Sequence, residues 1–202
     1  MLVTFNLRML MILSKGDLNL YILEDRKRNL KFVKNYSTLK YLFNILIVKQ
    51  ENYLAYRYLK NLRKYEYSIN CLKGKSFFGN LVYRYRYIRY SRLCFKYDIT
   101  LPPNKVGYGL YLPHIVGGGI IANVHSIGNY CAINCNVLLG NKHTGVPIIG
   151  NNVDMTSGCK IIGGITVGDN VIIAPNTVVV KDIPSNAVVS GIPSKILKFN
   201  QG

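Results

Sequence analysis

The sequence predicts a parallel β-helix preceded by an α-helical domain in a chain of 202 residues. Aliphatic residues recur every six positions in the second half of the chain, whereas apolar residues in the first half follow helical spacing. The change occurs at "DITLPPNKVGYGLYL", where two prolines end the last helix and glycines become frequent. We therefore expect residues 1–97 to form a helical domain, 98–182 a β-helix and 183–202 a C-terminal tail.

The six-residue period defines the expected core of the β-helix. Its aliphatic positions are Ile121, Ile127, Ile133 and Leu139, followed by Ile149, Met155, Ile161, Val167, Ile173 and Val179. Three such hexapeptides form one triangular coil, so these side chains should stack in an internal column. Asn and Gly at the corners tolerate positive φ. Residues 106–180 leave room for about four coils.

Three helices are expected before the β-helix. The first follows "SKGDL", where Ser14 or Asp17 is a suitable N-cap. The second runs through residues 37–67 and can break near Gln50. The third covers residues 79–97.

The third helix alternates tyrosine with arginine. Tyr83, Tyr87 and Tyr90 form one stripe, and arginines surround it. Such a surface can stack on nucleic-acid bases. A helix–helix contact, with arginine stems packed over aromatic rings, is the alternative.

Basic residues are concentrated in the first half of the chain. Lys and Arg outnumber Asp and Glu by 26 to 9 overall, and residues 1–95 hold 19 of the basic and 5 of the acidic side chains. This excess suits a lipid headgroup surface, a phosphorylated ligand or nucleic acid, or it is a solvated basic face.

The cysteines and apolar runs indicate a cytoplasmic protein that is soluble or peripheral to the inner face of the membrane. The cysteines are five in number and form no CxxC pair, which argues against a disulfide framework or a zinc knuckle (Cys71, Cys94, Cys131, Cys135 and Cys159). No signal-peptide cleavage site follows the first apolar run. The run "YLFNILIV" is far shorter than the ~20 residues that span a bilayer.

Three segments resemble the hexapeptide-repeat acyltransferases, in particular the serine acetyltransferases. They are "VGYGLYLPHIVGG", "IGNNVDMTSGCKIIGGITVGDN" and "VVVKDIPSNAVVSGIPSKIL". In addition, "SKGDLNLYILEDRKRN" resembles the start of serine acetyltransferase-like proteins of surface-polysaccharide gene clusters. The resemblance implies a left-handed β-helix that assembles as a trimer, with each active site in a groove between neighbouring copies.

The resemblance also implies acetyl-CoA as co-substrate, without a metal. Acetyl-CoA would lie along the groove, and the matching contact positions are Ser157, Gly158, Pro175, Lys181 and Lys195. The two lysines suit a phosphorylated nucleotide because their ammonium groups form charge-assisted hydrogen bonds with phosphate. Both can also be solvated surface residues.

Acetyl transfer to a hydroxyl needs a base near the acceptor oxygen, and neutral histidine suits that role. His114 occupies the position of the catalytic histidine of serine acetyltransferases, and Asp98 best matches their helper carboxylate, one residue out of register. His143, in the loop "GNKHTGV", is the second candidate base. His125 falls at an expected inward position, where packing is its simplest role.

Two departures from the serine acetyltransferase pattern concern the acceptor. Pro113 replaces the acidic residue before the catalytic histidine, and Gly145 and Val146 fall where an Arg-His pair is found. Those residues hold the amino and carboxylate groups of serine in the family, so their loss favours a saccharide hydroxyl in surface-polysaccharide synthesis. O-acetylation of L-serine is the alternative.

Two other classes compete with an acetyltransferase. A γ-type carbonic anhydrase would need three histidines around zinc, but the spacings of the three histidines here lack the close pair of that class. A non-enzymatic β-helix scaffold would bind nucleic acid or membrane through its basic helices. The tail motif favours the enzyme, for which no nucleic-acid partner is expected.

Overall fold

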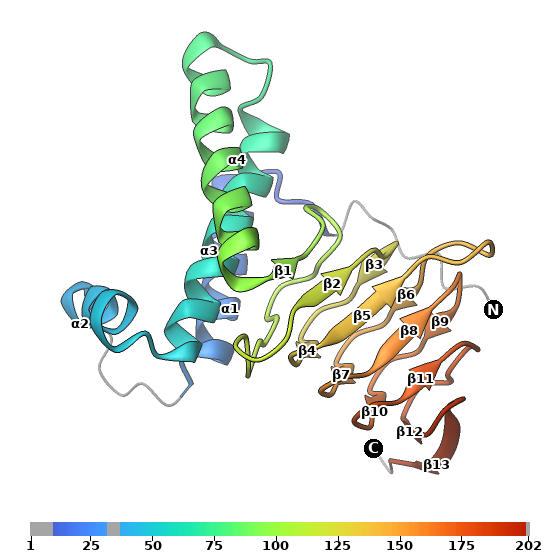
Figure 1. Cartoon of the computed structure of the whole chain (residues 1–202). Coiled ribbons are helices and arrows are strands. Elements are labelled where there is room, and N and C mark those ends of the chain that lie inside the picture. The colour runs from blue at the N-terminus through green and yellow to red at the C-terminus, as the bar shows by residue number, and fades with distance from the viewer. Residues whose placement is uncertain (1–9, 32–36, 201–202) are drawn as a thin grey trace.

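The computed structural model describes residues 10–31 and 37–200 (Figure 1). Residues 1–9, where the sequence predicts no signal peptide, lie outside this range. Four α-helices and one π-helical turn precede the strands within the described residues: α1 (Lys15–Asn29), α2 (Thr38–Phe43), η2 (Asn44–Val48), α3 (Glu51–Cys71) and α4 (Phe77–Tyr97). None of the helices in this part of the chain is long and apolar enough to cross a bilayer.

The helix boundaries follow local sequence signals. Ser14 is the N-cap of α1 and Asp17 completes a reciprocal capping box, so both predicted residues take part. The break expected near Gln50 is confirmed, because Lys49 adopts the left-handed conformation between η2 and α3.

The expected packing of tyrosines between helices is confirmed. Tyr83, Tyr87 and Tyr90 of α4 all contact the ring of Tyr65 in α3, with ring centroids 5.2–6.0 Å apart. The tyrosine stripe therefore holds the α3–α4 pair together.

The strands form a parallel β-helix with three faces, whose coils stack away from the helices (Figure 1). The β1 face contains β1 (Ile99–Thr100), β2 (Ile120–Ala122), β5 (Val137–Gly140), β8 (Lys160–Ile162) and β11 (Val178–Val179). The β3 face contains β3 (Ser126–Ile127), β6 (Ile148–Ile149) and β9 (Thr166–Val167). The β4 face contains β4 (Ala132–Ile133), β7 (Asp154–Met155), β10 (Ile172–Ile173), β12 (Ala187–Ser190) and the antiparallel β13 (Lys195–Phe199).

The β-helix begins earlier and ends later than the repeat alone indicates. The β1 face has five strands, and isolated bridges at Val106, Tyr111 and Ile183 extend the other two faces. The described chain therefore has five coils rather than about four. The first coil starts at Ile99, directly after α4, and β12 in the expected tail completes the last one.

The predicted core column is confirmed at every position except Ile121. The other nine aliphatic residues of the period have no exposed surface, whereas Ile121 is 52% exposed. The register explains the difference, since Ala122 pairs with Leu139 and Ile120 with Val137, so Ile121 faces outward. The inward spacing from Ala122 to Ile127 is one residue short of six. His125 is also outward and half-buried, because Val124 is the inward residue.

A fully buried ion cluster joins the helices to the first coil. Arg63 of α3 donates to Asp25 of α1 at 2.8 Å and to Glu66 at 3.1 Å. The same guanidinium donates to the carbonyls of Val106 and Gly107, at 2.8 and 2.6 Å. Each charge is thereby paired, which a buried ion requires.

Candidate functional site

The turns between the three faces form three edges of the β-helix. The His114 edge joins the β4 face to the β1 face and contains residues 112–119, 134–136, 156–159, 174–177 and 191–194. The His143 edge joins the β1 face to the β3 face and contains residues 123–125, 141–147, 163–165 and 180–182. The asparagine edge joins the β3 face to the β4 face and carries Asn152, Asn170 and Asn186.

His114 lies on the first turn of the His114 edge, just after the strand position of Tyr111. Its side chain is 64% exposed, and Nδ1 lies 3.1 Å from Oε2 of Glu51 at the start of α3. With Nδ1 engaged by a carboxylate, Nε2 is the ring nitrogen that can accept a proton from an acceptor hydroxyl. The carboxylate also stabilises an imidazolium once it forms.

Asp98 caps the C-terminal end of α4 in the left-handed conformation and has an exposed side chain. Its main-chain carbonyl accepts from the amide of Ile120 at 2.9 Å, and its carboxylate packs on Gly119. No hydrogen bond joins it to His114 within residues 10–31 and 37–200, so the ring contact of this single chain is made by Glu51.

Three of the expected CoA-contacting residues lie along the same edge as His114. Main-chain hydrogen bonds connect successive turns there, from Asn136 to Gly118, from Gly158 to Cys135 and from Asn176 to Ser157. Coils stack at the strand spacing of about 4.8 Å, so Ser157 and Gly158 lie about 10 Å from the His114 turn. Pro175 lies one coil further on. The edge is therefore a continuous ledge of small residues with the histidine at one end.

His143 and Lys181 lie on a different edge. His143 is exposed in a tight turn closed by Lys142 and Gly145, and the hydroxyl of Thr144 in the same turn accepts from the amide of Gly164. Lys181 lies two coils further along that edge. The β1 face separates both residues from His114 on the same chain.

Lys195 begins the antiparallel β13 and is exposed. It pairs with Ser190, the last residue of β12, next to the final turn of the His114 edge. The lysine therefore lies at the opposite end of the ledge from His114.

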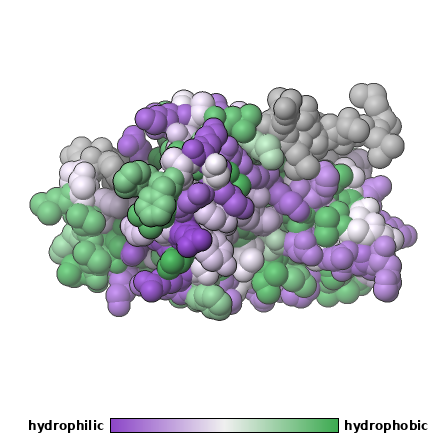
Figure 2. All heavy atoms as spheres, turned by 90° about the horizontal axis from the view of Figure 1, so that it is seen from above, coloured by the Kyte–Doolittle hydropathy of each residue, from purple (hydrophilic) through white to green (hydrophobic). Residues whose placement is uncertain are grey.

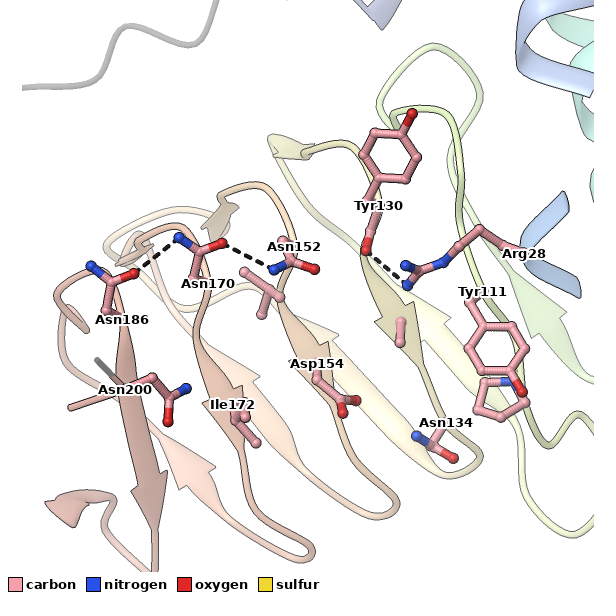
Figure 3. Close-up of a pocket in the computed structure, with 13 residues that line it drawn as sticks. Arg28, Tyr111, Tyr130, Asn134, Asn152, Asp154, Asn170, Ile172, Asn186 and Asn200 are labelled. Atoms are coloured by element: carbon pink, nitrogen blue, oxygen red, sulfur yellow. Dashed lines mark hydrogen bonds between the residues drawn. The ribbon is translucent and has the colours of Figure 1, made fainter. Parts of the chain in front are cut away.

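The structure also contains a trough that the sequence did not indicate (Figure 3). It has a volume of about 580 Å³ and runs over the β4 face from Arg28 and Pro113 to Asn186. Arg28 of α1 donates to the carbonyl of Tyr130 at 3.1 Å and closes one end. The trough begins at the residue before His114, so it adjoins the candidate base.

The trough is polar along one side and has an unpaired carboxylate on its floor. Asn152 donates to Asn170 at 3.0 Å and Asn170 to Asn186 at 2.9 Å, which forms a ladder along the asparagine edge (Figure 3). Oδ1 of Asp154 is buried without a hydrogen-bond partner in the described part of the chain. Burial raises the pKa of this carboxyl, and the charge of Arg28 opposes the shift. A ligand hydroxyl would satisfy the unpaired oxygen.

Sequence reasoning missed Glu51 and the trough for different reasons. Glu51 is 63 positions away from its partner His114, and no sequence motif near either residue predicts that the two side chains meet. The asparagines recur once per coil, and this spacing is also the ordinary pattern of turn residues with positive φ, so it does not by itself predict a ladder. No three His, Cys, Asp or Glu side chains come together as a metal site in the residues described.

Comparisons with known proteins agree with the fold and the motifs. No protein-family model matches the chain. A serine acetyltransferase of Buchnera aphidicola is 34% identical over 160 residues, covering 73% of this chain and 52% of the relative. One from Synechococcus elongatus is 36% identical over 100 residues, covering 48% and 41%, and one from Staphylococcus aureus is 38% identical over 101 residues, covering 48% and 47%. The matches thus span about half the length of these curated relatives.

Solved serine acetyltransferases share the architecture of nearly the whole chain. Soybean serine acetyltransferase aligns with a TM-score of 0.66 at 20% identity, covering 91% of this chain and 70% of that one. The Neisseria gonorrhoeae enzyme in complex with serine aligns at 0.61 with 26% identity, covering 92% and 71%. The chain is serine acetyltransferase-like in sequence and fold. The expected hexapeptide-repeat architecture is thereby confirmed.

Proposed function

We propose that this protein is an acetyl-CoA-dependent O-acetyltransferase. The observation that carries the proposal is the ledge that starts at His114 and continues through Ser157, Gly158 and Pro175. Relatives and solved neighbours are named serine acetyltransferases, and one Brucella abortus neighbour was solved in complex with coenzyme A, with a TM-score of 0.64, 21% identity and coverage of 93% of this chain and 70% of that one.

The residues of the ledge suit such a co-substrate. The thioester would lie near His114, the pantetheine arm would follow the small residues, and the phosphorylated end would reach Lys195. An extended arm can follow main chain closely only where side chains are small, and Gly158 leaves no room for a Cβ beside Asn176. The ammonium group of Lys195 would bind phosphate through charge-assisted hydrogen bonds.

In the proposed reaction, Nε2 of His114 accepts the proton of the acceptor hydroxyl as its oxygen attacks the thioester carbonyl. The C–S bond then breaks, the acetyl ester forms, and His114 returns the proton to the sulfur of CoA. Glu51 would hold the ring through Nδ1 and stabilise the imidazolium. His143 and Lys181 would enter a site only from another copy, because the β1 face separates them from His114.

We infer a homotrimer, which would bring the two separated edges together. Three copies related by a three-fold axis would bring the His114 edge of one copy to the His143 edge of the next, and each of three equivalent grooves would then hold both histidines. The proposed trimer thus explains why two candidate bases occupy different edges.

L-Serine is the acceptor that the relatives favour, since all the quoted relatives are named serine acetyltransferases. The saccharide acceptor expected from the sequence gains no support from those names. One observation keeps it as a second candidate: the trough beside Pro113, with its asparagine ladder and unpaired Asp154 oxygen, offers hydrogen-bonding groups that suit a hydroxyl-rich ligand.

The test measures release of the CoA thiol from acetyl-CoA, with L-serine and separately with a panel of nucleotide sugars. The wild type, His114→Ala and the matched control His125→Ala are compared. We expect turnover with serine that is lost in His114→Ala and kept in His125→Ala. Turnover only with the sugars, lowered by Asp154→Asn, would favour the second candidate. An active His114→Ala enzyme would overturn the proposed base.

A further inference from the structure

One side of α4 carries exposed apolar and basic side chains along the whole helix. We call this side the outer face of α4; its residues, which share one side of the helix by their spacing, are Phe77, Phe78, Leu81, Tyr85, Ile88, Arg89, Arg92, Phe95 and Lys96. Phe77 is 79% exposed and Phe95 is 88% exposed. The opposite side carries the tyrosines that pack on α3. Isolated apolar residues on a surface are ordinary, but a stripe of this length indicates a contact surface.

Cations alternate with these apolar side chains, and α4 contains no acidic residue. A hollow of about 390 Å³ is lined by Arg89, Arg92 and Lys96 together with Arg57 of α3. Burial and the neighbouring cations Arg86, Lys60 and Arg89 lower the pKa of Lys64 in α3. None of the salt bridges among the described residues includes Arg89, Arg92 or Lys96, so the positive charge of the outer face has no carboxylate partner there.

None of the few carboxylates of the helical half forms an ion pair with the outer face of α4 among the described residues. Asp17 caps α1, Glu24 pairs with Lys27, and Glu51 contacts His114. Asp25 and Glu66 are buried with Arg63. Asp98, which follows α4, packs on Gly119. The cations of the outer face are therefore available to an anionic partner outside the described chain.

The arrangement disfavours a second copy of the chain as that partner. Leu81, Ile88 and Phe95 are seven residues apart, but the companion positions of a coiled-coil seam hold Arg84 and Ser91. Two copies of this face would also bring like charges together. Nucleic acid would pair with the arginines, yet it offers no apolar environment for Leu81 and Ile88.

We propose that the outer face of α4 binds the surface of an anionic lipid bilayer. The helix would lie along the surface, with Phe77, Leu81, Ile88 and Phe95 at the boundary between headgroups and acyl chains. Arg89, Arg92 and Lys96 would contact lipid phosphates. Binding at this face does not depend on which reaction the β-helix performs.

Within the single chain, no other described element covers the outer face of α4. The α3–α4 pair projects from the first coil, in a direction away from the later coils of the β-helix (Figure 1). Figure 2, which views the molecule from the end where α3 and α4 meet, shows apolar and polar side chains interleaved over the helices. Leu39, Leu42 and Phe43 of α2 add further exposed apolar surface in the helical half.

The test is co-flotation of the purified full-length protein with vesicles. One set consists of phosphatidylcholine alone and the other of phosphatidylcholine with phosphatidylglycerol. We expect binding to the anionic vesicles at least about tenfold tighter than to the neutral ones, weakening as salt increases. Comparable binding to both sets, or binding to neither, would overturn the proposal.

Two pairs of matched variants separate the face from general charge and hydrophobicity. Arg89→Glu with Arg92→Glu should reduce binding at least tenfold, whereas Lys15→Glu with Lys27→Glu, which makes the same change in net charge on α1, should not. Phe77→Ser with Phe95→Ser should lose most of the binding that survives high salt, whereas Leu20→Ser with Leu23→Ser, at two exposed leucines of α1, should not. Circular dichroism melts confirm that each variant is folded.

Two further results would reassign the face. If Phe77→Ser with Phe95→Ser changes the oligomeric state in sedimentation while vesicle binding is absent, the face joins copies of the chain. If a single-stranded oligonucleotide competes with vesicles and binds more tightly than they do, the partner is nucleic acid. Either outcome refutes the lipid proposal.

Discussion

Nδ1 of His114 lies 3.1 Å from Oε2 of Glu51, which joins the first turn of the β-helix to the first residue of α3. The helical domain thus contributes directly to the candidate site, because the side chain that contacts the histidine ring comes from a helix 63 positions earlier in the chain. Fixing one ring nitrogen defines the tautomer in which the other can act as base.

Glu51→Gln should therefore lower kcat about tenfold or more while leaving KM for acetyl-CoA nearly unchanged. The amide retains the shape of the carboxylate but cannot stabilise an imidazolium. Steady-state kinetics of CoA release provide the measurement, and Asp98→Asn is the matched control at the carboxylate expected from the sequence. A larger loss in Asp98→Asn than in Glu51→Gln would assign the helper role to Asp98.

Mixed assemblies test whether one site uses two copies. His114→Ala and His143→Ala subunits should each be weakly active, and an equal mixture refolded together should recover about a quarter of the wild-type sites in a random trimer. Activity assays and sedimentation on the same samples measure this recovery. If the mixture never exceeds the two separate variants, both histidines act within one chain or His143 has no part in the reaction.

The sequence alone predicts the core of the β-helix, but it does not predict the contacts within the candidate site. The six-residue period predicted nine of the ten inward positions because burial within a coil depends on local alternation. The prediction was wrong for Ile121, because a short turn shifts the register there. His114 was found through a motif, whereas its contact with Glu51 depends on how α3 docks against the first coil, which no local pattern encodes. The order of Ser157, Gly158 and Pro175 along one edge follows from counting coils.

Gly158→Ala should destabilise the fold by about 1–3 kcal/mol and weaken acetyl-CoA binding. Gly158 has φ of 77°, and an added Cβ would collide with Oδ1 of Asn176 in the next turn. Urea unfolding and a binding titration measure the two effects. Gly140→Ala is the control, since a Cβ there meets nothing within 4 Å. Equal effects of the two substitutions would contradict the steric explanation.

Arg63→Met should cost about 3–5 kcal/mol near neutral pH, because it leaves Asp25 and Glu66 buried without their cation. Burial already raises the pKa of the Asp25 carboxyl above its ordinary 3.8 despite the opposing charge of Arg63. The pKa of Glu66 is raised by burial in the same way. Without the guanidinium both folded-state pKa values should rise further.

The sign of the resulting pH dependence follows from proton uptake. A carboxyl whose pKa is higher in the folded than in the unfolded state binds more protons when folded, so the free energy of unfolding falls as pH rises between the two values. The deficit of Arg63→Met should therefore be smaller at acidic pH, just above the ordinary carboxyl range, than near neutrality. Urea unfolding across that range measures it, with Asp25→Asn and Glu66→Gln added to Arg63→Met as the uncharged control. A deficit that does not change with pH, or one that the control shares, would show that lost packing rather than unpaired charge causes the instability.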